Sequence, residues 1–563
     1  GRKFGIWSPQ EVQYSNLLST YLPWLFPLTI SLLAATSEEF WFRLFAIPLL
    51  RKWVRFIWLA VVLPAFVWGF LHAGYPQQPP YIRGIEVGVI GVAAGYLMIR
   101  FGILATLVWH YTVDAVLIGM FLFQTDSWYF RISGFVVAGA VAIPLILSIV
   151  YYRRQNGFQI LEAPEVREAV VIEPSPSEAP AQIATVSTPA APSWPVRRLY
   201  AAAALGLVAV IFFQPRPFGG FIQVRLTREE AYAAADHEMR RRNLGPDTWI
   251  RAGRFLPNLN PAPLEYIRRI AGSETAEKAV RDHTHTAIWR VRYFKPAQKE
   301  EWRVYVDQSG AVVRTDHLLD ENAAGAQLPP EQARSIAEDW LRGQHIPVNR
   351  WSLVDSQTRK RENRTDHTFV WENPDFRIGE ARVRWEVQVI GGEPSFQRSF
   401  IKLPEQWLRD FARPRIQRFL APGFIGVLVA IAFILFLKSL SAGRHTYHTR
   451  TYVLVTLTTM VLNIAGTISG WPGMYNGYDT AMPWSTFLAG MVIGICVLVL
   501  VLALAVLLGV VALDVLRQSV TTAWRRAPAP LLRAASVTLL IWGFNACAKR
   551  LFEWVPGPRY SLD

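Results

Sequence analysis

Apolar runs close to 20 residues long alternate with short polar connections over most of the chain, and one long polar stretch interrupts this pattern. Because roughly 20 apolar residues cross a bilayer as a helix, the pattern predicts a mainly α, polytopic membrane bundle with about ten spans. The first run follows a short polar lead without an initiator Met, so we expect upstream sequence to be missing. We expect spans at residues 20–50, 55–73, 83–100, 101–123, 132–151, 197–214, 417–438, 450–471, 485–514 and 530–549.

Composition and charge agree with a membrane protein. The 563 residues are 52% apolar and 18% charged and include 22 Trp, outside the usual soluble range. The net charge of +15 does not indicate nucleic acid, because Lys and Arg gather beside every second connection. This positive-inside pattern predicts a multi-pass protein of the cytoplasmic (inner) membrane, in contact with lipid; a solvated basic face is the alternative. The basic positions are Arg51, Lys52, Arg55, Arg100, Arg153, Arg154, Arg197, Arg198, Lys438, Arg444, Arg450, Arg517, Arg525 and Arg526.

The pattern divides the chain into successive parts. Residues 1–152 are predicted to form a compact helical membrane unit, and residues 153–196 are a Pro- and Ala-rich linker that cannot bury a core. A single span at 197–214 follows. Residues 215–413, the outer region, are polar and are predicted by the charge pattern to lie outside the cytoplasm. Residues 414–563 return to the membrane.

The polar region contains an internal repeat, with units at about 226–320 and 328–405. "LTREEAYAAADHEMRRRNLGPDTW", from Leu226, aligns without gaps with "LPPEQARSIAEDWLRGQHIPVNRW", from Leu328, at a constant offset of 102 positions. Thr227 offers an N-cap, so each unit should open with a helix. Alternating stretches such as "AIWRVRYF" and "ARVRWEVQVIGG" predict antiparallel strands, with turns at Ser309-Gly310 and Gly391-Gly392. The two α+β units resemble PepSY-type domains; a duplicated packing module is the alternative.

Ionisable side chains interrupt the first apolar run at "TSEEFWFRLF", residues 36–45. A charge inside a membrane helix costs at least about 2–3 kcal/mol and normally faces a partner or a wet cavity. Glu39 and Arg43 stand at i and i+4, so we expect them to neutralise one another as a structural pair. Glu38 points about 100 degrees away around the helix and is left free.

Two other predicted spans carry polar side chains that would face a common internal cavity. His72 follows Trp68 by four positions, and His110 and Asp114 share one helical face. Each has a simple structural alternative: an interfacial hydrogen bond for His72, helix packing for His110, and a bridge or snorkelling charge for the Glu/Arg pair. Their combination predicts that both histidines, Glu38 and Asp114 meet inside the bundle.

These spaced motifs resemble the intramembrane CAAX-prenyl-protease and bacteriocin-processing enzymes, the Abi or type II CAAX endopeptidase group. The family motifs are Glu-Glu-x-x-x-Arg, Phe-x-x-x-His, and His-x-x-x-Asn or Asp, and here they read "EEFWFR", "WGFLH" and "HYTVD". The resemblance covers residues 20–150 and has two departures, Trp68 for Phe and Asp114 where Asn is common. It implies hydrolysis of a peptide bond in a membrane-associated polypeptide, which in the eponymous case is prenylated.

The chemistry of peptide hydrolysis suits these residues. It needs an activated water, a proton carrier and a donor for the developing oxyanion. We expect Glu38 to act as the base and His72 to position the water or share its proton. The resemblance implies that His110 and residue 114 stabilise the oxyanion. An ionised Asp114 only accepts hydrogen bonds, so it must be protonated or must orient His110 as the donor.

A zinc-type or other divalent-metal site is the rival chemistry, as in an intramembrane metalloprotease. No helical His-Glu-x-x-His pattern is present, and both cysteines, Cys496 and Cys547, lie in apolar runs. We therefore favour glutamate-activated water without a cofactor. The ligands of the metal alternative would be Glu38, His72, His110 and Asp114.

The depths of the two histidines conflict if the spans are straight. At about 1.5 Å per residue, His110 lies roughly 15 Å past Arg100 and His72 roughly 26 Å past Arg55. We expect either a kink at Pro64 or an interfacial course for residues 53–58.

Two other functional hypotheses remain open. A non-catalytic membrane scaffold or transporter-like protein would line a path with the buried charges and bind a partner through its outer region. Alternatively, the outer region regulates proteolysis by presenting a polypeptide to the membrane unit. Glu38→Gln and His110→Ala distinguish the first hypothesis from proteolysis, and deletion of residues 220–410 tests the second.

Overall fold

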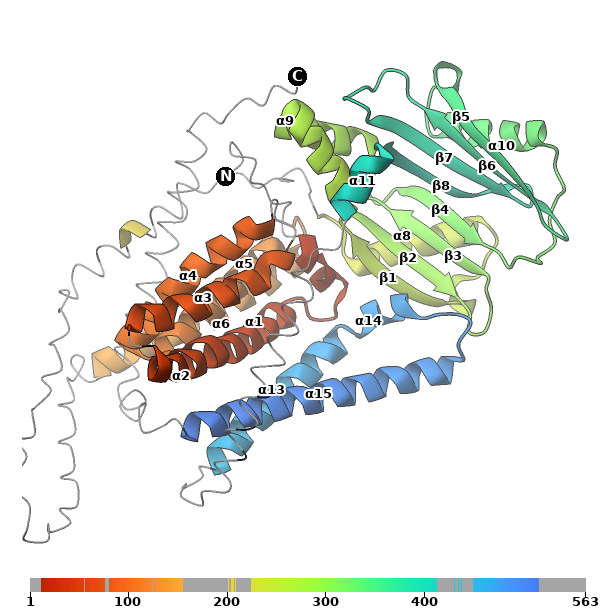
Figure 1. The fold of residues 1–563 in the computed structure, drawn as a ribbon. Helices are drawn as coiled ribbons and strands as arrows, with labels where there is room; N and C mark the ends of the chain where they lie inside the picture. The colour runs from red at the N-terminus through yellow and green to blue at the C-terminus, as the bar shows by residue number, and fades with distance from the viewer. Residues whose placement is uncertain are drawn as a thin grey trace, which may run out of the picture.

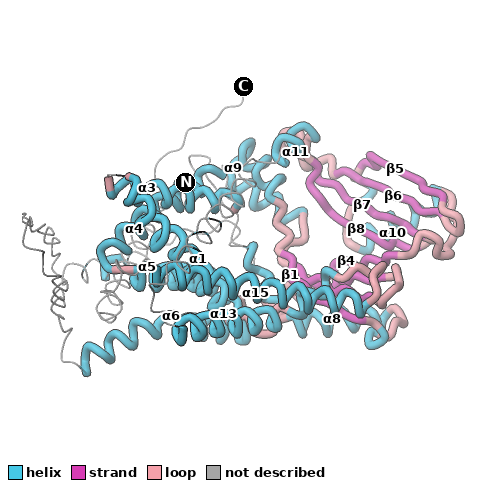
Figure 2. The backbone as a smooth tube through the Cα atoms, turned by 60° about the horizontal axis from the view of Figure 1, so that its bottom comes forward, coloured by secondary structure: helices cyan, strands magenta, loops and turns pink. Residues whose placement is uncertain are grey.

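Helices occupy one end of the molecule and two β-sheets occupy the other (Figure 1 and Figure 2). The fold is therefore mostly helical with two antiparallel sheets, in agreement with the predicted class. The computed structural model describes residues 12–54, 56–75, 80–123, 125–154, 224–412 and 449–515, with isolated positions between 201 and 208 and between 430 and 437.

The N-terminal membrane unit is a bundle of antiparallel helices. Its first three segments follow one another without a break and form a single rod that carries the Glu-Glu-x-x-x-Arg motif. A 3-10 segment, η2 (Val12–Ser19), precedes them. The unit consists of α1 (Leu25–Glu39), the π-helical segment η3 (Phe40–Phe45), α2 (Ala46–Trp53), α3 (Ile57–Leu71), α4 (Pro80–Phe101), α5 (Ile103–Phe123) and α6 (Trp128–Arg154).

The prediction of about ten spans is not supported. The first predicted span, 20–50, changes from α-helical to π-helical winding and back along the continuous rod of α1, η3 and α2. The helix α13 contains only a shorter apolar stretch, Thr456–Ser469. The spans predicted at 197–214, 417–438 and 530–549 lie largely or wholly outside the described residues. Within the described residues, five helices are long and apolar enough to cross a membrane: Ile57–Gly74, Tyr81–Arg100, Ile103–Phe123, Trp128–Tyr151 and Trp484–Val501.

The connection between α2 and α3 addresses the conflict over depth. The backbone is extended at Val54 and Phe56, so α3 starts as a new helix at Ile57. Trp53 and Trp58, on either side of this break, are exposed, and aromatic side chains are enriched where helices leave the bilayer. The break thus supports the interfacial course expected for residues 53–58.

Glycines bring α3 and α4 unusually close together. A Cβ added at Gly69 would lie 2.3 Å from the carbonyl oxygen of Gly84, so no side chain fits there. Such contacts between small residues are typical of helix pairs in membranes. On α4, a Cβ at Gly91 would lie 2.9 Å from Cε3 of Trp68. The missing side chain at Gly91 therefore makes room for the Trp68 indole.

The outer region consists of two units, each a helix followed by four antiparallel strands in sequential order. Thr227 caps the first helix by accepting from the Glu230 backbone N–H, while the Glu230 carboxylate accepts from the Thr227 N–H, as the sequence predicts. The first unit comprises α8 (Arg228–Arg241), β1 (Ile250–Leu256), β2 (Ile288–Phe294), β3 (Glu301–Val306) and β4 (Val312–Leu318), with α9 (Pro261–His283) inserted after β1. The second unit comprises α10 (Pro330–Gly343), β5 (Ser352–Lys360), β6 (Thr365–Glu372), β7 (Arg382–Ile390) and β8 (Glu393–Lys402), followed by α11 (Glu405–Ala412).

The first outer unit is tied to both groups of membrane helices. Its Arg228 donates to the carbonyl oxygen of Ser19, just before α1, at 3.2 Å. Its Arg292 donates to the carbonyl oxygen of Tyr478 at 2.7 Å; Tyr478 connects α13 to α15. These C-terminal helices run beside α1 (Figure 1 and Figure 2). They are α13 (Thr449–Ser469), α14 (Trp471–Met474) and α15 (Trp484–Val515).

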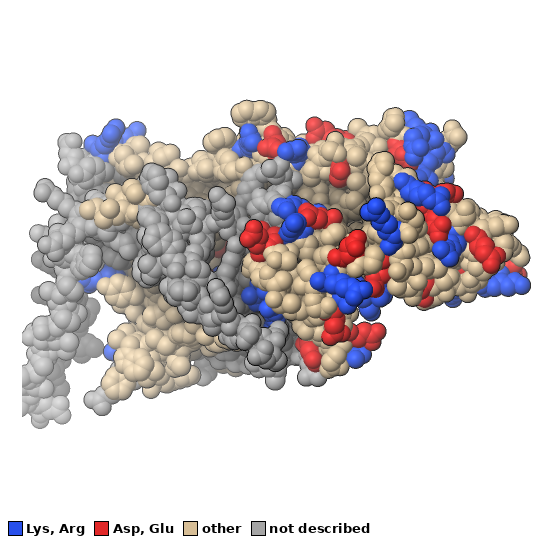
Figure 3. All heavy atoms as spheres, turned by 90° about the horizontal axis from the view of Figure 1, so that it is seen from above, with Lys and Arg blue, Asp and Glu red and all other residues tan. Residues whose placement is uncertain are grey.

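Charged side chains are distributed unevenly between the two ends. In Figure 3, Lys, Arg, Asp and Glu crowd over the sheets, whereas the described helical end is mostly uncharged. Many large apolar side chains of α3, α4, α6 and α15 are nevertheless exposed, as expected where a helix faces lipid. Together with the five apolar helices, this indicates a multi-pass membrane protein.

Candidate active site

Polar side chains from α1, from α5 and from His72, the residue that directly follows α3, meet inside the membrane unit, as the sequence predicts. The carboxylate oxygen Oε2 of Glu38 lies 3.7 Å from Nε2 of His72 and 3.8 Å from Nε2 of His110. Asp114 joins them, with Oδ2 at 3.4 Å from Nε2 of His110. The Glu38 side chain is 28% exposed, so the cluster is accessible rather than sealed in the core.

The helix that carries both glutamates changes its winding at the motif. The hydroxyls of Thr36 and Ser37 donate to carbonyl oxygens one turn earlier, each at 2.7 Å, which satisfies them in an apolar setting. Directly after Glu39 the chain enters η3, where the Ala46 N–H bonds the carbonyl oxygen of Trp41, five residues back. π-helical turns are rare and occur often at functional sites.

Glu39 has a second partner besides the one predicted. Its Oε1 lies 3.2 Å from Nη1 of Arg43, in agreement with the predicted pair. The same oxygen accepts a hydrogen bond from Nδ1 of His110 at 2.8 Å. Glu39 is 0% exposed and Arg43 1% exposed. The pair is thus fully buried and also orients the imidazole of His110.

Both histidines present the same ring nitrogen to Glu38. Nδ1 of His72 lies 2.9 Å from the carbonyl oxygen of Trp68, and Nδ1 of His110 bonds the Glu39 carboxylate. Carbonyl and carboxylate oxygens only accept hydrogen bonds, so each Nδ1 carries a proton. The Nε2 atoms are therefore the ones that face Glu38, an orientation set by the second partner of each ring.

Trp68 is a member of the cluster that the sequence assigned only as a motif position. Its Nε1–H donates to Oε2 of Glu38. The guanidinium of Arg43 lies over its ring, with Cζ 3.9 Å from the centroid. The signal in the sequence was the replacement of Phe by Trp, the aromatic residue that adds an N–H donor.

The metal alternative stays a prediction. Within the described residues, no three His, Cys, Asp or Glu side chains are placed so that they could hold a metal ion. The oxygen of Glu38 nearest to both imidazoles already accepts from Trp68. We therefore derive no step through a metal.

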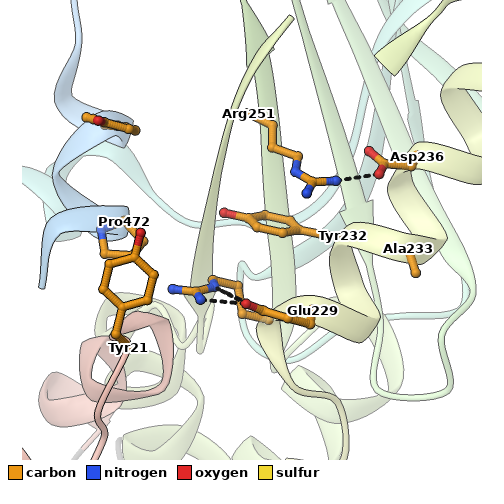
Figure 4. A pocket seen from close by; sticks show the side chains of 9 residues that line it. Tyr21, Glu229, Tyr232, Ala233, Asp236, Arg251 and Pro472 are labelled. Carbon is orange, nitrogen blue, oxygen red and sulfur yellow. Dashed lines mark hydrogen bonds and ion pairs between the residues drawn. The ribbon is translucent and has the colours of Figure 1, made fainter. Parts of the chain in front are cut away.

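A separate pocket of about 460 Å³ lies where the outer region meets the membrane helices (Figure 4). Its lining includes Tyr21, which precedes α1, and the helix from Leu25 to Glu38 alone is roughly 20 Å long at 1.5 Å per residue. Its arginines, Arg228 and Arg251, are paired with Glu229 and Asp236. Because its charges are already neutralised, we assign this pocket no chemistry.

Comparison with known proteins agrees with the geometry. Residues 20–116 match a family model described as "Type II CAAX prenyl endopeptidase Rce1-like". The sporulation-killing factor biosynthesis protein SkfC of Bacillus subtilis (strain 168) is 30% identical over 97 residues, which make up 17% of this chain and 20% of that protein. No solved structure matches the chain.

The match confirms that the N-terminal region resembles the CAAX protease and bacteriocin-processing family. It includes Glu38, His72, His110 and Asp114, and it ends before α6. The matched family consists of intramembrane proteases. The matched segment covers only about a fifth of SkfC, and the PepSY resemblance of the outer region stays a prediction.

Proposed function

We propose that this protein is an intramembrane endopeptidase that uses a water molecule activated by Glu38. The observation that carries the proposal is the position of the Glu38 carboxylate between Nε2 of His72 and Nε2 of His110, at 3.7 and 3.8 Å. A water in this space would lie within hydrogen-bond reach of a base and two imidazoles, which general acid–base catalysis requires. The family match of residues 20–116 supports the same reaction class.

In the proposed reaction, Glu38 carries one proton from the attacking water to the departing amine. Glu38 accepts a proton from the water as the water oxygen bonds to the carbonyl carbon of the scissile peptide. The carbonyl π electrons move to its oxygen, which becomes an oxyanion. The oxyanion electrons then re-form the C=O bond as the C–N bond breaks, and the protonated Glu38 gives its proton to the departing amine nitrogen. His72, whose Nδ1 proton is engaged by the Trp68 carbonyl oxygen, accepts from the same water through Nε2.

His110 is the proposed oxyanion donor. With protons on both nitrogens, it donates to Glu39 through Nδ1 and presents Nε2–H near Asp114 and Glu38. Asp114 then orients the imidazolium ring instead of contacting the oxyanion itself, which is the second of the two roles open to an acid at this position. A preorganised donor of this kind stabilises charge that develops in the transition state.

The proposed substrate is a peptide or protein held in or at the membrane. The resemblance leads us to expect a lipid-modified chain as one member of this class. We place the protein in the cytoplasmic membrane with residues 215–413 outside the cytoplasm. In support, α6 begins beside the outer region, where the Asp126 N–H bonds the Val224 carbonyl oxygen, and ends at the basic pair Arg153 and Arg154.

The test compares membranes that contain the native protein with membranes that contain Glu38→Gln. Newly formed peptide termini identified by proteomics should appear only with the native protein, and turnover of a peptide drawn from them should fall at least a hundredfold in the variant. Asp126→Asn, a change at an exposed carboxylate of the same unit, should cleave normally.

The opposite outcome would favour the scaffold or transporter-like alternative. In that case Glu38→Gln and His110→Ala would leave both the set of termini and the biological output unchanged. Metal analysis of the purified protein, combined with activity after chelation, tests the metal alternative in the same preparation.

A further inference from the structure

Trp68 contacts four members of the cluster at once. Its Nε1–H donates to Glu38, and its carbonyl oxygen accepts from His72. Its ring lies under the Arg43 guanidinium. The same ring meets the imidazoles of His72 and His110 edge-on, with centroids 5.1 and 5.7 Å apart. No other side chain of the described cluster has contacts of all these kinds.

The packing around Trp68 fixes where its N–H points. The side chain is buried, and its six-membered ring lies against Gly91 of α4, where a Cβ would come within 2.9 Å. The Arg43 guanidinium covers one ring face. A buried indole held by these two contacts cannot rotate freely, so its donor stays directed at Oε2 of Glu38.

We infer that Trp68 is a positioning residue for Glu38, on which the proposed function depends. A carboxylate turns readily about its last bond, and an N–H fixed on one oxygen restricts that rotation. The hydrogen bond therefore keeps Oε2 of Glu38 facing the Nε2 atoms of His72 and His110. A Phe at this position, as in the family motif, keeps the ring face for Arg43 but has no N–H.

Trp109 provides a matched control. It is also a buried Trp and lies next to His110, with ring centroids 5.9 Å apart. Its Nε1 has no hydrogen-bond partner among the described residues. Trp109→Phe thus removes an indole and leaves a similar gap, but it breaks no hydrogen bond.

The experiment measures turnover of a peptide substrate by Trp68→Phe and Trp109→Phe in the full-length protein. We expect kcat of Trp68→Phe to fall about tenfold with KM unchanged, the size of one lost hydrogen bond to a charged group. Trp109→Phe should stay within about twofold. Equal kcat values in the two variants would overturn the inference.

Two further measurements keep the test decisive. Replacing Trp68 by 3-benzothienylalanine exchanges the N–H for sulfur and keeps the ring shape, so it should reproduce the loss even if Trp68→Phe folds poorly. In protein labelled with ¹⁵N at the indoles, the resonance absent from Trp68→Phe should move in Glu38→Gln and stay in place in Asp126→Asn. If this resonance does not shift in Glu38→Gln, the hydrogen bond between Trp68 and Glu38 is contradicted.

The same set of variants separates this inference from the proposed function. If Glu38→Gln keeps native activity, the peptidase proposal fails, whatever the indole resonance does. If Glu38→Gln is inactive and Trp68→Phe turns over like Trp109→Phe, only the positioning role fails.

Discussion

The membrane unit and the outer region treat charged side chains in opposite ways. In the outer region charges are numerous, and many of them lie at the surface and pair with neighbours along the same element, as Arg334 and Arg342 do with Glu338. In the membrane unit the buried pair of Glu39 and Arg43 is packed against the imidazole of His110. The outer region spreads most of its exposed ion pairs over a charged surface, whereas the membrane unit places its buried pair within one polar cluster.

The contrast explains why charge was informative in one region only. An exposed pair contributes roughly 0–1 kcal/mol and can occur anywhere on a surface. A buried charge without a partner is destabilising by several kcal/mol, so it persists only where its surroundings satisfy it or where a function requires it. Ionisable residues in apolar helices therefore pointed to a site, whereas those of the outer region did not.

The largest expected effect comes from breaking the buried pair. Arg43→Met removes the guanidinium from the Glu39 carboxylate, which is 0% exposed and keeps only His110 as a polar partner, and should lower the free energy of unfolding by about 3–5 kcal/mol. Arg342→Met, at a side chain 57% exposed, should change it by no more than about 1 kcal/mol. Unfolding of both variants in the same detergent checks this, and equal losses would contradict the contrast.

The next effect concerns the close contact of α3 and α4. Gly69→Ala places a methyl group against the backbone of Gly84, so the helices must separate, with a loss of about 1–3 kcal/mol. Because α3 carries Trp68 and ends directly before His72, the proposed proteolytic activity should fall as well. Gly139→Ala, where the added Cβ meets nothing within 4 Å, is the control. Thermal unfolding of the two variants in detergent is the measurement. If Gly69→Ala is as stable as Gly139→Ala, α4 has shifted to accommodate the methyl group and the predicted loss is wrong.

The smallest effect tests the outer region, where the edge strands β4 and β8 lie side by side. His317 of β4 bonds Glu393 of β8 and also Glu300. This hydrogen bond is the largest influence on the pKa of Glu393 and, together with the charges of His317 and Arg242, holds it below its ordinary 4.5.

A lowered carboxylate pKa stabilises the folded form above the ordinary value, and the stabilisation is lost as the pH falls below 4.5. Hydrogen exchange of β4 and β8, corrected for its intrinsic pH dependence, should therefore speed up below that pH. Glu393→Gln should show a smaller acid response than the native protein. Glu405→Gln, at an exposed pair on α11, should respond as the native protein does, and identical responses in all three would rule out the contact.

Local spacing predicted much of the site because the motifs are short. Helical periodicity placed Glu39 beside Arg43 and His110 beside Asp114, and both contacts are present. The Ser309-Gly310 and Gly391-Gly392 turns were also predicted, and these three glycines have positive φ, where glycine is favoured. The count of about ten spans is not supported among the described residues, and the predicted repeat did not indicate α9, which is inserted between β1 and β2.

The sequence by itself determined which chemical groups stand in the membrane, at what intervals, and that the outer region is repeated. Only the tertiary structure decided that Glu39 also holds His110, that Trp68 directs its N–H at Glu38, and that the first outer unit bonds both groups of helices. The physical reason is that periodicity fixes neighbours within one helix. Contacts between helices depend on how closely they approach, which here follows from glycine packing and a break in the backbone.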